Sequence, residues 1–245
     1  MLETLSYSYN GLEMEGALAL PANVTPETPA VLIAHTWMGV DDYVRRRATE
    51  LAERGYIALA LDIFGKNVRP QNTDEAVAAM TDAKADPKVL RGRLQAGFEA
   101  LKNKFNLQPN RMAAIGFCFG GHCALEMARM GLPLAGVASF HGLLQTALPA
   151  APGGIKASVL VLHGADDPMA PPAHVVEFLA EMKAAQADAQ FVAYSSTVHS
   201  FTNHTANNLA GGTQYSERTS ARSFRLMEDF FTELFNPQSQ KNGMR

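Results

Sequence analysis

One cysteine of this sequence lies in a setting that suits a nucleophile. A buried strand, a tight turn and a helix follow one another in RMAAIGFCFGGHCALEMARM, and the turn is Gly116-Phe117-Cys118-Phe119-Gly120. This is the pattern of a nucleophile elbow with cysteine in place of serine. The helix that follows would direct positive potential and free N–H groups at the thiol, which lowers a thiol pKa. We therefore take Cys118 as the candidate nucleophile, although a free cysteine is also a common core residue.

A nucleophile of this kind needs a base, and the base needs an acid that orients it. In chains with such an elbow the order is nucleophile, acid, histidine. The segment GADDPMAPP follows a strand expected over residues 157–163, and His199 follows a strand expected over 191–195. We favour Asp167 as the acid over Asp166, because of its Gly-x-x-Asp spacing and the proline after it. Asp166 could instead cap the next helix or face solvent.

The elements around these residues are predicted from hydrophobic patterning. Asn10-Gly11 between two alternating segments predicts an N-terminal antiparallel hairpin. Beyond it, short apolar runs alternate with helical patterns, which is typical of a parallel sheet with right-handed crossovers. These strands should end near residues 35, 62, 117, 140, 163 and 195. The helices should cover residues 41–54, 73–85, 87–105, 119–130, 173–185 and 215–235.

Composition sets the class of protein. The 245 residues are 47% hydrophobic and 18% charged, and this composition excludes a disordered, collagen-like or coiled-coil chain. The net charge of −3 gives no sign of a basic face for nucleic acid. The first residues lack the features of a secretory signal, and the longest apolar run is far below the ~18 residues of a membrane span. We expect one α/β domain over residues 1–235, a disordered polar tail over 236–245, and a cytoplasmic protein that binds neither membrane nor nucleic acid.

Metal and nucleotide sites find little support. Cys118, His122 and Cys123 lack a second Cys or His pair at zinc-site spacing, and His-Glu-x-x-His does not occur. No Gly-x-Gly-x-x-Gly or Walker loop occurs either. We expect no metal, no cofactor and two reduced thiols.

The elbow GFCFGG, the acid loop HGADDPMAP and the histidine loop VHSFTN together resemble the dienelactone hydrolase family of α/β-hydrolases. The segments EGALALP, LDIFGK and SFHGLL extend the likeness over most of the chain. The resemblance implies an α/β-hydrolase fold, a mostly parallel central sheet flanked by helices. It also implies Cys118 as nucleophile, Asp167 as acid and His199 as base. The oxyanion hole that it implies is formed by the backbone N–H groups of Phe119 and Trp37, although the lone Trp37 could instead pack a hydrophobic lid.

Two departures from the family pattern concern specificity. Thr36 stands where dienelactone hydrolase has a glutamate beside its nucleophile, and threonine cannot exchange a proton near neutral pH. The family enzyme also has an arginine shortly after its histidine to hold the substrate carboxylate, whereas residues 200–203 are Ser-Phe-Thr-Asn. Activity on dienelactone itself therefore does not follow from the resemblance.

These observations predict a hydrolase that cleaves a small ester or lactone through an acyl-thioester, acting as a monomer or homodimer. Thioester, amide or carbonate cleavage by the same three residues stays open, as does a non-catalytic binding protein of this fold. The candidate pocket residues are loop residues expected at the carboxyl ends of strands: His35, Thr36, Met38, Phe64, His141, Leu143, Met169 and Phe201.

Overall fold

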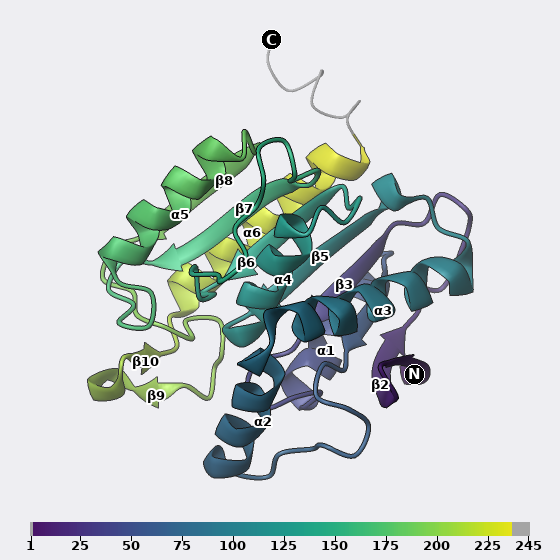
Figure 1. The fold of residues 1–245 in the computed structure, drawn as a ribbon, viewed down its shortest axis with the longest axis horizontal. Coiled ribbons are helices and arrows are strands. Elements are labelled where there is room, and N and C mark those ends of the chain that lie inside the picture. Colours follow the sequence, from purple (N-terminus) through teal and green to yellow (C-terminus); the bar gives the residue numbers. More distant parts are fainter. Residues whose placement is uncertain (1, 237–245) are drawn as a thin grey trace.

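A central sheet of eight strands organises the computed structural model, which describes residues 2–236 (Figure 1). The strand order is β1-β2-β4-β3-β5-β6-β7-β8, with the β1–β2 hairpin antiparallel and the strands from β4 to β8 parallel. The strands are β1 (Leu2–Tyr9), β2 (Leu12–Ala19), β3 (Ala30–Ala34), β4 (Ile57–Leu61), β5 (Met112–Phe117), β6 (Gly136–Phe140), β7 (Ser158–Gly164) and β8 (Ala189–Tyr194). The predicted hairpin and mostly parallel sheet are confirmed, and nearly all of the predicted tail lies outside the described residues.

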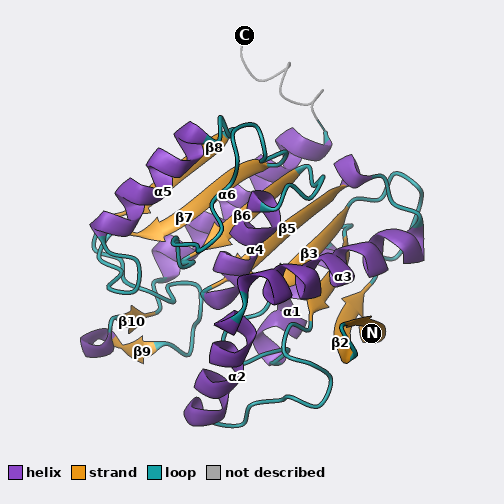
Figure 2. Ribbon diagram, viewed as in Figure 1, coloured by secondary structure: helices purple, strands orange, loops and turns teal. Residues whose placement is uncertain are grey.

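Helices cover both faces of this sheet (Figure 2). One face carries α1 (Asp42–Glu53) and α6 (Glu217–Phe235), and the other carries α3 (Pro87–Phe105), α4 (Phe119–Arg129) and α5 (Pro172–Ala184). A further helix, α2 (Thr73–Ala85), is mostly exposed and lies at one end of the sheet (Figure 1). Each predicted helix is present, with its ends within two residues of the prediction.

The two-faced burial is visible along a single strand. In β3, Leu32 packs in the core on the α3–α4 side, whereas Val31 and Ile33 pack on the α1–α6 side, and all three are fully buried. Side chains alternate between the two faces of a strand, so a strand covered on both sides must be apolar at every position. This double coverage accounts for the continuous apolar runs and the low charged fraction of the sequence.

A small hairpin follows β8 and was not predicted. It comprises β9 (Asn207–Asn208), a single 3₁₀ turn (Leu209–Gly211) and β10 (Thr213–Gln214). Strands of two residues are too short to show alternation, so the sequence pattern carries no signal for them.

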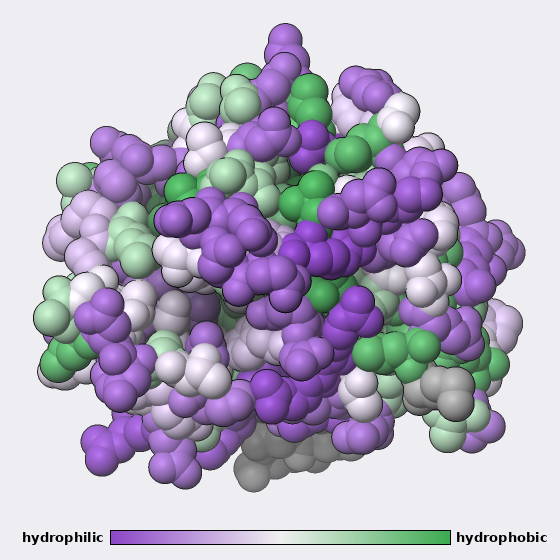
Figure 3. Space-filling view, turned by 90° about the horizontal axis from the view of Figure 1, so that it is seen from below, coloured by the Kyte–Doolittle hydropathy of each residue, from purple (hydrophilic) through white to green (hydrophobic). Residues whose placement is uncertain are grey.

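The face that holds this hairpin and α2 is mainly hydrophilic, with apolar side chains in small separate groups (Figure 3). No helix among residues 2–236 is long and apolar enough to cross a membrane.

A buried carboxylate joins the N-terminal hairpin to the loop after β4. Asp62 Oδ1 accepts the N–H groups of Phe64 and Gly65 at 3.1 and 2.9 Å. Its Oδ2 accepts the N–H of Glu15 on β2 at 3.0 Å and pairs with Arg69 Nη2 at 3.2 Å. Asp62 is 1% exposed, so these four partners replace its lost hydration.

Replacing Asp62 by alanine should therefore destabilise the protein strongly. Asp62→Ala leaves three N–H groups and the Arg69 guanidinium without their acceptor, and we expect the free energy of unfolding to fall by about 3 kcal/mol. Urea denaturation followed by circular dichroism measures this change. Asp229→Ala, at an exposed position on α6, is the control and should change stability by less than about 0.5 kcal/mol. Equal effects of the two substitutions would contradict an anchoring role for Asp62.

Candidate active site

Cys118 lies at the turn between β5 and α4 with a backbone φ of 57° and ψ of −118°. Non-glycine residues seldom adopt a positive φ, so the surrounding packing must hold this strained turn in place. The packing is close, because a Cβ atom at Gly120 would lie 2.0 Å from the carbonyl oxygen of Ala34 on β3. The cysteine itself is partly exposed. The turn thus presents a thiol at the carboxyl end of the sheet.

The first turn of α4 has no side-chain cap. Side chains do cap the starts of α1, α2, α3 and α6: Asp41, Asn72, Asp86 and Ser216 respectively. Among residues 2–236, no acceptor binds the N–H of Phe119 at the start of α4 or the N–H of Trp37 in the loop after β3. Because β3 and β5 are neighbouring parallel strands, two free donors lie in adjacent loops at the same end of the sheet.

The acid and histidine loops bring Asp167 and His199 together. His199 Nδ1 and Asp167 Oδ2 are 2.7 Å apart, and both residues are at most 2% exposed. A carboxylate oxygen only accepts, so Nδ1 carries the proton of this hydrogen bond. The other ring nitrogen, Nε2, is buried and has no hydrogen-bond partner among the described residues. Cys118 is nevertheless close enough to raise the pKa of the ring. Asp166, the alternative acid, is exposed.

The protonation of His199 depends on its two partners. Burial by itself lowers the pKa of this imidazole, but the nearby Cys118 and the hydrogen bond to Asp167 raise it to about 10. The raised pKa favours the imidazolium form of His199 near neutral pH, so the ring can act as a proton donor.

The β9–β10 hairpin, which was not predicted, forms backbone hydrogen bonds with the histidine loop. The N–H of His199 donates to Gly212 O at 3.0 Å, and the N–H of Gln214 donates to His199 O at 3.1 Å. Gly212 has a φ of +77°, and a Cβ atom there would lie 2.2 Å from Pro168 Cγ in the acid loop. The hairpin thus fixes the backbone of His199 and packs on the residue after Asp167. The Gly-Gly pair at 211 and 212 was the only turn signal for it in the sequence.

His35, predicted as a pocket residue, is fully buried behind the loop after β3. Its Nδ1 lies 2.6 Å from Thr36 O, and its Nε2 accepts the N–H of Ile63 at 3.2 Å. Burial lowers the pKa of His35 to about 4, so the ring is neutral with its proton on Nδ1. In this position His35 joins the Trp37 loop to the loop after β4. Thr36 is also engaged, since its hydroxyl accepts the N–H of Met38 at 3.3 Å.

Other predicted pocket residues divide between surface and core. His141 and Phe201 are at most 1% exposed and pack edge to face, with ring centroids 5.0 Å apart. Phe64 is 4% exposed and lies against Phe119, with centroids 5.8 Å apart. Met38 is partly exposed and Met169 is exposed. The sequence placed these residues on loops at the ends of strands, but it could not tell which side chains turn inward.

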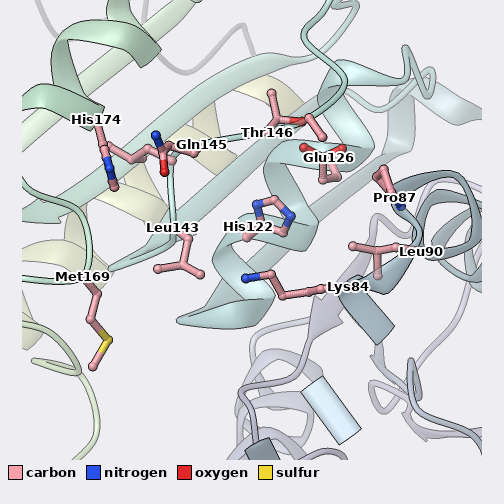
Figure 4. A pocket seen from close by; sticks show the side chains of 12 residues that line it. Lys84, Pro87, Leu90, His122, Glu126, Leu143, Gln145, Thr146, Met169 and His174 are labelled. Carbon is pink, nitrogen blue, oxygen red and sulfur yellow. The ribbon is translucent and has the colours of Figure 1, made fainter. Parts of the chain in front are cut away.

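A pocket of about 280 Å³ opens beside the first turns of α4 (Figure 4). Leu143 and Met169 from the predicted set line it, together with Lys84 and His122, which the sequence did not assign to a pocket. Burial lowers the pKa of His122 to about 4, although the nearby Glu126 acts in the opposite direction. The pocket therefore offers a neutral imidazole, a carboxylate and a lysine beside apolar side chains.

The part of the chain that the structure describes contains no group of three or more His, Cys, Asp or Glu side chains that could hold a metal ion.

Known proteins share this sequence and fold. A sequence profile described as the dienelactone hydrolase family matches residues 14–235. A protein of Aquifex aeolicus with the provisional name carboxymethylenebutenolidase is 26% identical over 243 residues, covering 94% of this chain and 98% of that protein. A Bradyrhizobium protein provisionally named 2-oxo-3-(5-oxofuran-2-ylidene)propanoate lactonase is 28% identical over 205 residues, covering 80% of this chain and 82% of that protein.

Two solved structures are similar over nearly the whole chain. The structure named m3DLH superposes with a TM-score of 0.88 at 32% identity, covering 96% of this chain and 99% of that one. A dienelactone hydrolase-like promiscuous phosphotriesterase from metagenomic libraries superposes with a TM-score of 0.87 at 31% identity, covering 96% and 98%. With the family profile matching most of its length, the chain belongs to the dienelactone hydrolase family and is a hydrolase of ester or lactone bonds.

Proposed function

We propose that this protein cleaves a small ester or lactone with Cys118 as nucleophile, His199 as general base and acid, and Asp167 as the group that orients His199. The observation that carries the proposal is the buried 2.7 Å contact between Asp167 and His199 beside a cysteine at a strained turn. On this route thiolate, imidazole and backbone dipoles supply the chemistry without a cofactor.

Acylation begins with attack of the Cys118 thiolate on the substrate carbonyl carbon. A carbon–sulfur bond forms, and the carbonyl electron pair moves onto oxygen, where the N–H groups of Phe119 and Trp37 are free to receive it. When the tetrahedral intermediate collapses, the bond to the leaving alkoxide oxygen breaks. His199 Nε2 then gives its proton to that oxygen. A lactone opens in this step and stays attached to the enzyme through the new thioester.

Deacylation needs His199 in its neutral form, and acylation itself brings this about. In the acyl-thioester the sulfur carries no charge, so the largest contribution that raises the pKa of His199 disappears. Burial, which lowers this pKa, is then opposed by Asp167 alone. The imidazole can accept a proton from water, whose oxygen attacks the thioester carbon and releases Cys118. The covalent state of Cys118 thus sets the role of His199 in each half of the cycle.

Lactones are the first substrate class to test. The Bradyrhizobium relative is named as a lactonase and the Aquifex relative as a carboxymethylenebutenolidase, both of which point to lactone rings. Thr36 and the absence of arginine at residues 200–203 argue against a site tuned to dienelactone itself. Phosphotriesters form a second class, because a structure 31% identical to this chain is named as a promiscuous phosphotriesterase.

The covalent route predicts an acyl-enzyme on one cysteine. Wild-type protein mixed with p-nitrophenyl acetate should release a burst of nitrophenolate and gain one acetyl group by intact mass. Cys118→Ala should lose both signals, with turnover reduced by at least about 10³-fold, because the attacking atom is gone. Cys123→Ala is the matched control, since Cys123 is fully buried, and it should retain the acetyl adduct. Turnover of Cys118→Ala near the wild-type rate would exclude this route.

Alkylation of Cys118 should be nearly independent of pH in the neutral range. The pKa of His199 is raised to about 10, and we propose that the imidazole holds the proton while Cys118 forms an ion pair with it as a thiolate. Iodoacetamide should then react as fast at pH 6 as at pH 8. In His199→Asn the thiol loses this partner and approaches an ordinary pKa of ~8.5, so its rate should fall by more than about tenfold from pH 8 to pH 6. A comparable fall in the wild-type protein would contradict the ion pair.

A further inference from the structure

A chain of buried polar groups runs from the backbone of Cys118 away from the substrate side. The N–H of Cys118 lies 3.2 Å from His141 Nδ1 and 3.1 Å from Phe140 O. His141 Nε2 lies 2.8 Å from Thr202 Oγ1, which in turn lies 2.8 Å from the Tyr43 hydroxyl. His141 and Thr202 are 1% exposed, and Tyr43 is 7% exposed. The chain therefore joins the elbow, the loop after β6, the histidine loop and α1 inside the protein.

The partners of His141 fix the position of its proton. Nδ1 faces an N–H group, so it must offer a lone pair. A neutral imidazole has one donor and one acceptor, which leaves the proton on Nε2, where it donates to Thr202 Oγ1. The Thr202 hydroxyl can complete the chain with Tyr43, because each of these two hydroxyls can donate or accept. Every group of the chain is satisfied only with this tautomer of His141.

The surroundings also keep His141 uncharged. Burial and the positive charge of His199 both lower the pKa of His141 well below its ordinary value. The two rings meet edge to face, with centroids 5.0 Å apart. On the α1 side two charged residues act on Tyr43: Arg47, whose guanidinium is 5.1 Å from the tyrosine ring centroid, and Asp41. With no carboxylate among its hydrogen-bond partners, His141 is the neutral neighbour of a charged imidazolium.

Two other roles for His141 do not fit its contacts. A pocket-lining role needs exposure, and His141 is 1% exposed. A role as a second base needs a free lone pair, and the lone pair of Nδ1 already accepts the Cys118 N–H.

We propose that His141 is a positioning residue: as an Nε2–H tautomer held by Thr202, it fixes the backbone of Cys118 at the elbow and directs the Cys118 N–H inward. This inference rests on the proposed role of Cys118 as nucleophile. The oxyanion is then left to the N–H groups of Phe119 and Trp37. If Thr202 could no longer accept, the proton could move to Nδ1, and two N–H donors would face each other 3.2 Å apart at the elbow. The turn would have to shift, and the thiol with it.

Replacing Thr202 by the isosteric valine tests this arrangement. Thr202→Val should lower kcat for p-nitrophenyl acetate by about 10- to 100-fold, because small displacements of a nucleophile are costly, and KM should change by less than about threefold. Thr202→Ser restores the hydroxyl and should restore most of kcat. Thr197→Val is the matched control, since that buried hydroxyl in the same loop bonds to Ser195 O and Thr219 Oγ1 and, among the described residues, to no atom of the His141 chain. It should lower thermal stability to a similar extent and leave kcat within about threefold of the wild type.

The ¹⁵N chemical shifts of the histidine rings report the tautomer of His141 directly. If Thr202 had only a structural role, its substitution would leave these shifts unchanged. The wild-type spectrum should contain a neutral imidazole with its proton on Nε2, and His141→Asn should remove that signal. In Thr202→Val the same ring should populate the Nδ1–H form. A wild-type His141 that is protonated on Nδ1 or on both nitrogens would overturn the proposal whether or not the variants fold. So would equal kcat values for Thr202→Val and Thr197→Val.

Failure of the proposed function gives a different result. If the wild-type protein forms no acyl adduct, Cys118 is not the nucleophile. The kcat values of the Thr202 variants then no longer test the role of His141. The tautomer of His141 in the wild-type spectrum is measured independently of turnover.

Discussion

The positive φ of 57° at Cys118 is the constraint on which the rest of the site depends. Such a conformation costs about 1–3 kcal/mol for a residue with a side chain, so it persists only where the fold supplies more than that in packing. Here β5 is buried along its whole length between β3 and β6, and α4 lies against the end of β3 so closely that only glycine fits at residue 120. The core therefore holds the thiol at a fixed point, and the loops that carry Asp167, His199 and Trp37 need only be arranged around it.

Three buried histidines surround this point, and burial acts on all three in the same direction. Burial by itself lowers the pKa of His35, His141 and His199, but only His199 lies beside both Asp167 and Cys118, which together raise its pKa. Two rings are thus neutral hydrogen-bonding groups with one donor and one acceptor, and one ring carries the mobile proton. The charge of His199 further lowers the pKa of His141, so protonation of His199 stabilises the neutral state of His141.

Sequence periodicity predicted most of the fold because the five strands from β3 to β7 are buried on both faces and most helices have a clear apolar side. The elbow, Asp167 and His199 could be picked out as candidates in the sequence for a related reason. Each follows a recognisable strand, and the carboxyl ends of parallel strands share one edge of the sheet. Strand order could not be read from local patterns, because it depends on crossovers between distant segments. The inward orientation of His35 and His141 was equally hidden, since a residue at a strand end can face the pocket or the core. The 207–214 hairpin lacks periodicity altogether.

Thr36 determines how the thiol can be activated. Its hydroxyl accepts the N–H of Met38 and has no titratable group to offer, so it can shape the Trp37 loop but cannot take a proton from Cys118. On the proposed route, proton transfer at Cys118 must then be handled by His199, whose pKa depends on the neighbouring sulfur. The route thus requires a thiolate that is present before substrate binds. The rigidity of the elbow matters for the same reason, because the proposed ion pair requires that the two loops keep sulfur and imidazole in contact.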